Sequence, residues 1–462
     1  MGNASDAIPS ERLSALGGER GRSALLLLGL LAASSITLTL ATPFAFRAGG
    51  DQAYMALAIA TGLAAVAATR VAEGAPEARA LWLIVGVAVL LRGILLFTEP
   101  LLSTDIYRYV WDGRVQAAGI NPYRLIPADG ALASLRDADI YPNINRAGYA
   151  VTIYPPVAQM FFFLVTRLGE NVTAMKLALL ACEAATATLI VLMLRRLRRP
   201  VTRLVAYAWH PLPLWEIANN GHVDALMVAL MLLGIWFTVG GRPVRGAVSI
   251  ALAALVKPYA ILVLPALWRP WNWKIPLVVS AVIAACYAPY LSVGWGVFGF
   301  TTGYISEEGL RTGDLVWALA VWRQIFGLIT GDYAVYLAGS AAVIAALAIV
   351  AAKREVRSLE TTLTDVNRLL LAFLFLLSPN YPWYFLAATP FVALIGGAPV
   401  WTITIGAVLL QEEAAWDGSV PILVSKSVHF GAFLVACAYV SWRALGAPRQ
   451  KVGYGDARLD AR

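Results

Sequence analysis

Residues 172–203 decide the fold class: VTAMKLALLACEAATATLIVLML (172–194) is followed by RRLRRPVTR (195–203). The apolar run at 172–194 is long enough to cross the hydrocarbon core of a bilayer as a helix, which takes about 20 residues. The loop at 195–203 carries five arginines and no acid. Because short arginine-rich loops stay in the cytoplasm, these residues predict a spanning helix and also its orientation.

The composition of the whole chain agrees with a membrane protein. Of its 462 residues, 59% are hydrophobic and 14% are charged, whereas a soluble domain has about 25% charged residues. The mean hydropathy is +0.69. These values exclude a cytosolic enzyme and a disordered protein. They also exclude a nucleic-acid binder, although the net charge is +8.

Apolar runs of spanning length recur along the chain and predict an all-α polytopic membrane protein with about 12 transmembrane helices. The segment 246–268 is interrupted at Lys257-Pro258 and predicts a broken helical hairpin, since proline disrupts the helical ladder. Two shorter runs, 156–168 and 315–329, predict helices in the membrane interface. The expected spans are 23–44, 53–69, 80–97, 172–194, 201–218, 222–239, 275–291, 334–352, 366–378, 383–396, 399–411 and 422–443.

The basic loops then place both termini in the cytoplasm. We interpret residues 1–462 as one membrane-embedded domain whose first apolar run is a transmembrane helix and not a cleaved signal peptide. The external side would hold a long segment at 98–171, a second at 292–333, and the short turns 378–382 and 411–421.

The external segment 98–153 is unusual because it contains six acids and five arginines but no spanning run. Within it, Thr104–Ala118 predicts an amphipathic helix that Gly119 ends. Helical spacing places four residues on one face, with Arg108 beside them. The four residues are Asp105, Tyr109, Asp112 and Gln116.

Asp105 is the candidate catalytic residue. It would lie in the first turn of its helix, where the helix dipole stabilises an anion. A carboxylate at the external membrane surface can act as a general base toward an acceptor hydroxyl. The alternative is structural: Asp105 and Asp112 would pair with Arg108 and Arg114 on a solvated helix face.

A series of motifs runs along the chain, from STDIYRYVWDGRVQAAGINPY (103–123) to LSPNYPWYF (377–385). By these motifs the chain resembles the GT-C superfamily of integral-membrane glycosyltransferases, and especially the bacterial polyprenyl-phosphate-mannose-dependent mannosyltransferases and their relatives in glycosyltransferase family 87. The resemblance covers most of the chain in order. It implies a GT-C-like bundle, a polyprenyl-phosphate sugar as donor, an inverting reaction and an active site that faces away from the cytoplasm, with the catalytic base at Asp105. The matching stretches are STDIYRYVWDGRVQAAGINPY (103–123), TIYPPVAQ (152–159), AWHPLPLWE (208–216), GHVDAL (221–226), LVKPYAILVLPALW (255–268), GYISEEG (303–309) and LSPNYPWYF (377–385).

Other polar residues in apolar context are candidates for substrate binding, because ionisable groups within membrane segments are costly and usually face the protein interior. Lys257 would face a lipid phosphate, or alternatively pair with Glu183. Asn220 and His222 would contact sugar or phosphate, or alternatively cap a helix junction.

The remaining candidates lie in the external segments. Glu307 and Glu308 would orient the acceptor, or form a solvated acidic loop. Asn380 and Tyr384 would donate hydrogen bonds to the lipid phosphate. Alternatively, Tyr384 would belong with Trp383 to an interfacial aromatic belt. The same two alternatives apply to Tyr154, which precedes two prolines. Arg108 and Asp112 complete the substrate-binding candidates.

No metal site and no cofactor are predicted. The three cysteines lack CxxC spacing and the three histidines are scattered, so neither a disulfide framework nor a zinc signature is present. A divalent cation held by Asp105 with Asp112 or Glu307 stays open. No motif for binding a nucleotide phosphate occurs.

The sequence thus favours an enzyme that transfers a hexose, expected to be mannose, from a polyprenyl-phosphate-linked donor to a cell-envelope glycan or lipid acceptor. Its place would be the bacterial inner (plasma) membrane, with the active site toward the periplasm or exterior. One alternative is a secondary transporter or flippase, which broken helices and Lys257 would suit. Another is a non-catalytic subunit of an envelope-glycan complex. The sequence fixes no oligomeric state.

Overall fold

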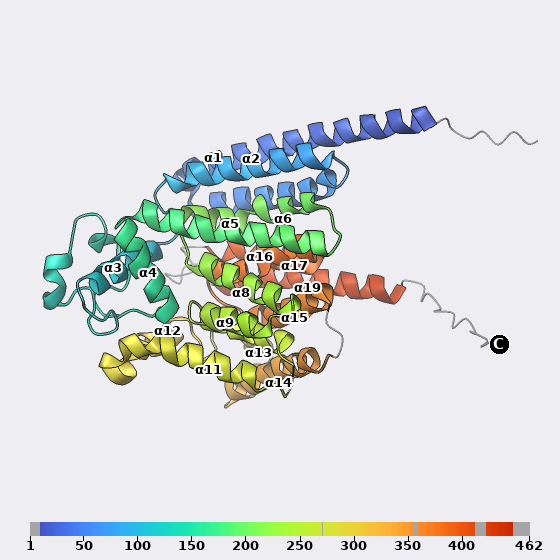
Figure 1. The fold of residues 1–462 in the computed structure, drawn as a ribbon. Coiled ribbons are helices and arrows are strands. Elements are labelled where there is room, and N and C mark those ends of the chain that lie inside the picture. The colour runs from blue at the N-terminus through green and yellow to red at the C-terminus, as the bar shows by residue number, and fades with distance from the viewer. Residues whose placement is uncertain (1–9, 270, 355–357, 412–421, 447–462) are drawn as a thin grey trace, which may run out of the picture.

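The computed structural model describes residues 10–269, 271–354, 358–411 and 422–446. Across these residues every regular element is helical and none is a strand (Figure 1). The long helices run roughly side by side as a bundle. A smaller group of short helices, α3, α4 and α12, lies at one end (Figure 1). The expected all-α fold is confirmed.

The first element, α1 (Ser10–Ala72), contains two arms that meet at Gly50. Gly50 has φ 62° and ψ −154°, a backbone conformation that glycine adopts readily and other residues avoid. The arms correspond to the expected spans 23–44 and 53–69. α2 (Glu77–Leu96) packs against α1 and matches the third expected span.

The external segment begins with α3 (Asp105–Ala117), within one residue of the expected helix at each end. It packs on α4 (Pro156–Leu168). The contact is close because Gly113 of α3 has no side chain: a Cβ there would overlap Thr166 and the carbonyl oxygen of Phe162.

Between α3 and α4 the chain forms two 3₁₀ turns, η1 (Gly130–Leu135) and η2 (Tyr141–Asn143). The Asp137 carboxylate lies between them and accepts hydrogen bonds from the backbone N–H groups of Ile140 and Tyr141. Such side-chain bonds compete with a continuous helix.

The expectation that residues 201–218 form one spanning helix is wrong. After α5 (Val172–Arg196) the chain forms four short turns before α8 (Asp224–Val239). Proline has no N–H and disfavours helix at the preceding residue. His210, before Pro211, is extended, and its Nδ1 accepts a hydrogen bond from Leu212 N. The turns are η3 (Val201–Leu204), α6 (Val205–Ala208), α7 (Pro211–Pro213) and η4 (Leu214–Asn219), the last a π-helical turn.

The broken hairpin is confirmed. α9 (Pro243–Ala254) ends before Lys257, whose backbone is extended at φ −138° and ψ 117°. The chain then returns along α9 as η5 (Pro258–Val263) and α10 (Leu264–Leu267).

The rest of the bundle follows in order, with several expected spans formed by two consecutive short helices. The elements are α11 (Lys274–Tyr287), η6 (Ala288–Phe298), α12 (Thr301–Glu307), α13 (Trp317–Phe326), α14 (Asp332–Lys353), α15 (Leu359–Leu377), η7 (Pro382–Ala388), α16 (Thr389–Leu394), α17 (Ala398–Gly406), η8 (Ala407–Leu410) and α19 (Ile422–Gly446). The expected external turn at 411–421 lies, beyond Gln411, outside the described residues.

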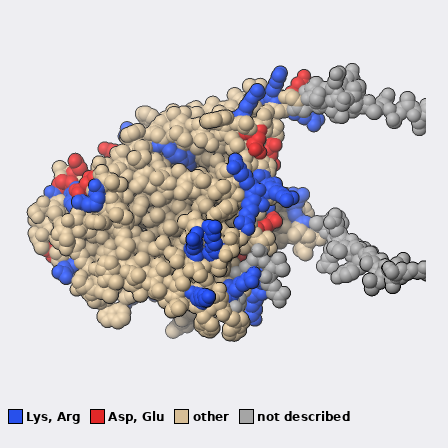
Figure 2. Space-filling view, in the orientation of Figure 1, with Lys and Arg blue, Asp and Glu red and all other residues tan. Residues whose placement is uncertain are grey.

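Six helices in the described part of the chain are long and apolar enough to cross a membrane, one of them being the two-armed α1. Six further apolar helices have 10–17 residues, so the number of about 12 spans stays a prediction. On the face seen in Figure 2, Lys and Arg gather at the end where α1 begins and α19 ends, and both signs of charge mark the opposite end. Most of the surface between the two ends carries no charge.

Candidate active site

A cavity of about 940 Å³ lies where the external segments meet the bundle. It brings together parts of the chain that are far apart in sequence, from the turn of α1 to the residue after η8. Its lining includes polar side chains from both long external segments, among them Asp105, Arg146 and Glu307. The lining residues are Phe46, Asp51, Pro100, Leu101, Leu102, Ser103, Thr104, Asp105, Asn145, Arg146, Tyr149, Ile153, Tyr154, Lys257, Tyr304, Glu307, Tyr381, Trp383 and Gln411.

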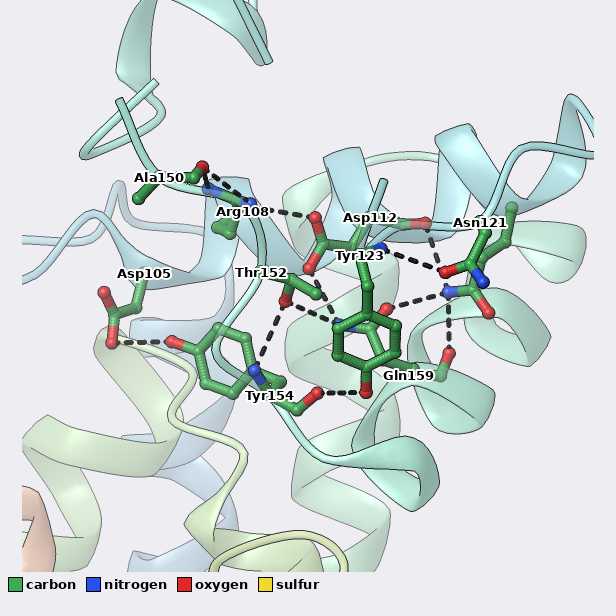
Figure 3. A network of polar contacts seen from close by, with 10 residues as sticks. Asp105, Arg108, Asp112, Asn121, Tyr123, Ala150, Thr152, Tyr154 and Gln159 are labelled. Carbon is green, nitrogen blue, oxygen red and sulfur yellow. Dashed lines mark hydrogen bonds and ion pairs between the residues drawn. The ribbon is translucent and has the colours of Figure 1, made fainter. Parts of the chain in front are cut away.

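Asp105 lies in the first turn of α3 and lines this cavity, with 13% of its side chain exposed. Its Oδ1 accepts a hydrogen bond from Asn145 Nδ2 (2.5 Å), and its Oδ2 accepts one from the hydroxyl of Tyr154 (3.1 Å; Figure 3). Tyr154 lines the same cavity, and its hydroxyl contacts Asp105 through the second of these bonds.

Several neighbours affect the ionisation of Asp105. Burial acts to raise its pKa. The nearby charges of His222 and Lys257 and the hydrogen bond from Asn145 together outweigh burial, so the pKa lies below its usual value. Asp105 is therefore an ionised carboxylate at neutral pH, as a general base must be before it accepts a proton.

Lys257 faces the cavity from the break in the α9–η5 hairpin. Its Nζ lies 3.1 Å from Asp224 Oδ2, and the rings of Tyr154 and Tyr384 lie 5.9 and 5.6 Å away, within cation–π range. The expected alternative, a pair between Lys257 and Glu183, is wrong.

Glu183 instead accepts hydrogen bonds from Nε and Nη2 of Arg92, at 3.1 and 2.6 Å. Arg92 also donates to the carbonyl oxygen of Ala208. This ion pair joins α2 to α5 inside the bundle, and neither residue lines the cavity.

Arg108 and Asp112 belong to a buried network beside the cavity and do not line it (Figure 3). Arg108 Nε donates to Asp112 Oδ1 (2.8 Å), and Gln159 Nε2 donates to Asp112 Oδ2 (2.9 Å) and to Thr152. Arg108 also donates to the carbonyl oxygen of Ala150. The network thus ties α3 to the segment that carries Tyr154.

The structural alternative is right about the partner of Asp112 but wrong about its surroundings, because the Arg108–Asp112 pair is buried and does not lie on a solvated helix face. Asp112 pairs with Arg108, whereas Asp105 makes no bond with Arg108 or Arg114 that would remove it from the cavity. Arg114 pairs with Asp137 and Glu170.

Asn220 and His222 are fully buried and lie behind the cavity wall. Asn220 Oδ1 accepts from Leu102 N (3.0 Å), so it fixes the segment that leads to Asp105. His222 stacks on Trp383, with ring centroids 4.2 Å apart. Neither caps α8, whose N-cap residue is Val223 and has no side-chain cap.

The four candidates from the later external segments separate into two groups. Glu307 lines the cavity, receives Arg146 Nε at 2.7 Å and accepts from the Tyr149 hydroxyl. Tyr384 bonds the hydroxyl of Tyr304 at 3.0 Å, beside Lys257.

Glu308 and Asn380 are buried away from the cavity. Asn380 Nδ2 donates to Glu308 Oε2 (2.8 Å), and Asn380 Oδ1 accepts from Lys426 Nζ (2.6 Å). Burial raises the pKa of Glu308. These bonds join the segment that carries Glu308 to α19, so Glu308 and Asn380 have a structural role here.

Sequence reasoning missed most of the cavity lining, including the polar residues Asn145, Arg146, Tyr304 and Tyr381. Arg146 has φ 56°, a conformation that is strained for a non-glycine residue and that clusters at functional sites. No spacing rule links these residues to Asp105, because Asn145, Arg146 and Tyr381 come from irregular segments and Tyr304 comes from α12, far along the chain. Trp383 and Tyr381 lay within the quoted motif LSPNYPWYF, and their aromatic spacing was the available signal.

The described residues contain no group of three or more His, Cys, Asp or Glu side chains that could hold a metal ion. Both carboxylate oxygens of Asp112 already accept hydrogen bonds from Arg108 and Gln159, and Glu307 is paired with Arg146. Asp112 and Glu307 therefore have other partners in this structure and are not free to bind a cation together with Asp105.

Comparison with known proteins identifies the family of the chain. Residues 26–273 match the sequence model described as "Alpha-(1->6)-mannopyranosyltransferase, N-terminal domain". Over 184 residues the chain is 32% identical to "Alpha-(1->6)-mannopyranosyltransferase A" of Mycobacterium tuberculosis, and this alignment covers 39% of this chain and 34% of the relative. Over 176 residues it is 26% identical to the protein of the same name from Corynebacterium glutamicum, covering 37% and 35%.

The aligned stretches span about a third of the length of these curated relatives. No solved structure matches the chain. The matched sequence model, however, covers more than half of the chain, including Asp105, His222 and Lys257. The resemblance to mannosyltransferases is thereby confirmed, and the chain belongs to the alpha-(1->6)-mannopyranosyltransferase family that this N-terminal domain defines.

Proposed function

We propose that this protein transfers mannose from a polyprenyl-phosphate-linked donor to a cell-envelope glycan or lipid acceptor on the external face of the bacterial inner membrane. The observation that carries the proposal is an ionised carboxylate, Asp105, in a cavity of about 940 Å³ that also contains the ammonium of Lys257. The names of the relatives support mannosyl transfer.

Asp105 is the proposed general base. The acceptor hydroxyl oxygen attacks the anomeric carbon of the donor, and the bond from that carbon to the phosphate oxygen breaks. The hydroxyl proton passes to Asp105 Oδ1 or Oδ2, and the product has the inverted anomeric configuration. The hydrogen bonds from Asn145 and Tyr154 orient the carboxylate for this step.

Lys257 and Arg146 are the proposed contacts of the donor phosphate. A phosphate leaving group gains negative charge in the transition state, and fixed cations stabilise that charge. Lys257 and Arg146 line the cavity, and the fields of both act on Asp105. The hydroxyl of Tyr384, which lies beside Lys257, is a further proposed donor.

The distribution of charge supports the orientation. The Lys- and Arg-rich end of the bundle suits the cytoplasmic side. The cavity lies with the external segments at the other end, so the proposed active site faces the periplasm or exterior. There a lipid-linked donor and a lipid or glycan acceptor would both reach it.

The test is transfer by the purified full-length protein in lipid, supplied with radiolabelled polyprenyl-phosphate-mannose and a lipid–glycan extract of the host. We expect a new labelled product with the native protein and at least a hundredfold slower formation with Asp105→Asn, because general-base assistance contributes about 10²–10⁴ in rate. Asp139→Asn is the matched control, since it removes an exposed carboxylate from the same external segment. Equal transfer by Asp105→Asn would place the base elsewhere.

A transporter or flippase is the second candidate, and the extended backbone at Lys257 inside an apolar hairpin favours it. It predicts movement of a labelled polyprenyl-phosphate sugar across vesicles that depends on Lys257 and is indifferent to Asp105→Asn. Absence of transfer from mannosyl, glucosyl, galactosyl and arabinosyl donors, together with such movement, would establish it. A non-catalytic subunit would show neither activity and would tolerate Asp105→Asn.

A further inference from the structure

A buried histidine lies between two carboxylates directly behind the cavity. His222 Nδ1 is 4.0 Å from Asp105 Oδ2, and His222 Nε2 is 3.2 Å from Glu216 Oε2. The side chains of His222 and Glu216 have no exposed surface. Asp105, at the front of this row, is the only one of the three that lines the cavity.

The neighbours of His222 favour one charge state of the imidazole. Neither ring nitrogen forms a hydrogen bond with a described residue, so no such bond holds the ring in a neutral tautomer. The groups nearest the two nitrogens are carboxylate oxygens, at 4.0 and 3.2 Å, and these attract a positively charged ring. A positive imidazolium between two negative groups also offsets the cost of burying them, which is large for any unpaired charge.

The other two histidines of the chain differ in this respect. His210 Nδ1 accepts a backbone N–H, so that nitrogen carries no proton, and its Nε2 lies beside a threonine hydroxyl. His429 Nε2 faces the carbonyl oxygen of Ile403, and His429 forms no ion pair with a carboxylate of the described residues. Only His222 has acidic neighbours on both sides.

The backbone is shaped to bring His222 to α3. Gly221 has φ 70°, and a Cβ at this position would overlap the side chain of Ile106, the residue after Asp105. Glu216 lies in the π-helical turn η4, an element that is often found at functional sites. On one face His222 stacks on Trp383, which lines the cavity.

We infer that His222 is a positioning residue: held as an imidazolium by Glu216, it orients the carboxylate of Asp105 and keeps it ionised for the transfer reaction. The inference rests on the proposed function of Asp105. In this inference Glu216 affects the reaction through His222 and does not contact the substrate.

Other groups also face Asp105, and their contributions have to be separated from that of His222. From the segment after η2 come Asn145 and Arg146, from the break before η5 comes Lys257, and Tyr154 precedes α4. Tyr381 before η7 and Tyr109 on α3 itself are further neighbours of the Asp105 charge. A single substitution of His222 leaves all of these in place.

The first experiment observes the imidazole directly. The chain has three histidines, so ¹⁵N-histidine labelling of the full-length protein in lipid nanodiscs gives three imidazole groups, and His222→Gln identifies one. We expect His222 to have both nitrogens protonated at neutral pH. A neutral His222 at neutral pH would overturn the inference, whatever the transfer assay shows.

The second experiment measures the pH dependence of mannosyl transfer. His222→Gln removes a positive charge about 4 Å from Asp105, so the acid limb of kcat/KM should move upward by about one to three pH units. We expect kcat to fall while KM for the donor stays the same. His429→Gln, the same change at another fully buried histidine, should leave the acid limb in place.

Glu216→Gln tests the outer carboxylate. We expect the same direction of shift, and the double variant His222→Gln/Glu216→Gln should be no worse than His222→Gln alone, because the two residues act as one unit. Additive losses, or an acid limb that does not move in His222→Gln, would refute the inference. A native protein that transfers no sugar would instead contradict the proposed function, and the nitrogen spectra would still decide the charge of His222.

Discussion

The ammonium of Lys257 lies 3.1 Å from the carboxylate of Asp224, and of the two side chains only Lys257 has any exposed surface. The pair is therefore anchored on the buried side by Asp224 and open to the cavity on the other. A ligand phosphate can approach Lys257 without removing its partner.

Lys257→Met should abolish most transfer and also destabilise the protein, because it leaves the Asp224 carboxylate buried and unpaired. Breaking a buried ion pair from one side costs about 3–5 kcal/mol. The double variant Lys257→Met/Asp224→Leu should recover much of the thermal stability without recovering transfer. Thermal unfolding in detergent and initial rates measure the two effects, and recovery of both together would argue against a role of Lys257 in donor binding.

Asp112→Asn should act on stability and not on the pH profile. Asp112 receives Arg108 and Gln159 inside the buried network, so the variant leaves Arg108 without its charge partner and should lose about 3 kcal/mol or more of stability. The acid limb of kcat/KM should not move. Loss of transfer as large as in Asp105→Asn, with an unchanged melting temperature, would place Asp112 in the chemistry.

Gly221→Ala should displace the turn that carries His222. The added Cβ overlaps Ile106 and the backbone keeps a positive φ, which together should cost about 2–4 kcal/mol. Adding Ile106→Ala removes the overlap but not the backbone strain, so it should restore only part of the stability, read from thermal unfolding. Full stability of Gly221→Ala alone would show that the turn adapts freely.

Glu308→Gln should stabilise the protein at neutral pH. Burial raises the pKa of Glu308 in the folded state above its ordinary value of 4.5, so native stability falls as pH rises from that value through the folded-state pKa. The glutamine variant does not titrate and can keep the bond from Asn380. Its melting temperature should exceed the native one by a few degrees at neutral pH, and the difference should shrink as the pH falls toward 4.5. A difference that grew at low pH would contradict this sign.

Local features of the sequence predicted much of the fold. The run at 172–194 with its arginine-rich loop, the helix at 104–118 and the break at Lys257-Pro258 all depend on residues within one or two helical turns. Hydrophobicity, helix caps and proline act at that range. Asp105 was identified in the same way, from its place at the start of an amphipathic helix and from the family resemblance.

The contacts that complete the site were not predictable in this way. Arg146 and Glu307 are 161 positions apart, and Asn380 is 46 from Lys426. Hydrophobic periodicity does not fix how neighbouring helices are rotated about their axes, so the choice of Asp224 over Glu183 as the partner of Lys257 followed only from packing. The segment 201–218 was apolar enough to span, and its two prolines divided it into turns.

The short apolar helices have a consequence for biogenesis. α8 has 16 residues, α9 has 12 and α17 has 9, whereas a bilayer holds a lone helix of about 20. Each of them packs on a neighbour that the ribosome makes later: α8 on α9, α9 on α11 and α17 on α19. We therefore expect that they do not all insert stably in the order in which they are synthesised. Reporter domains fused after truncation points within 205–269 should therefore give mixed orientations, and the intact chain should give one.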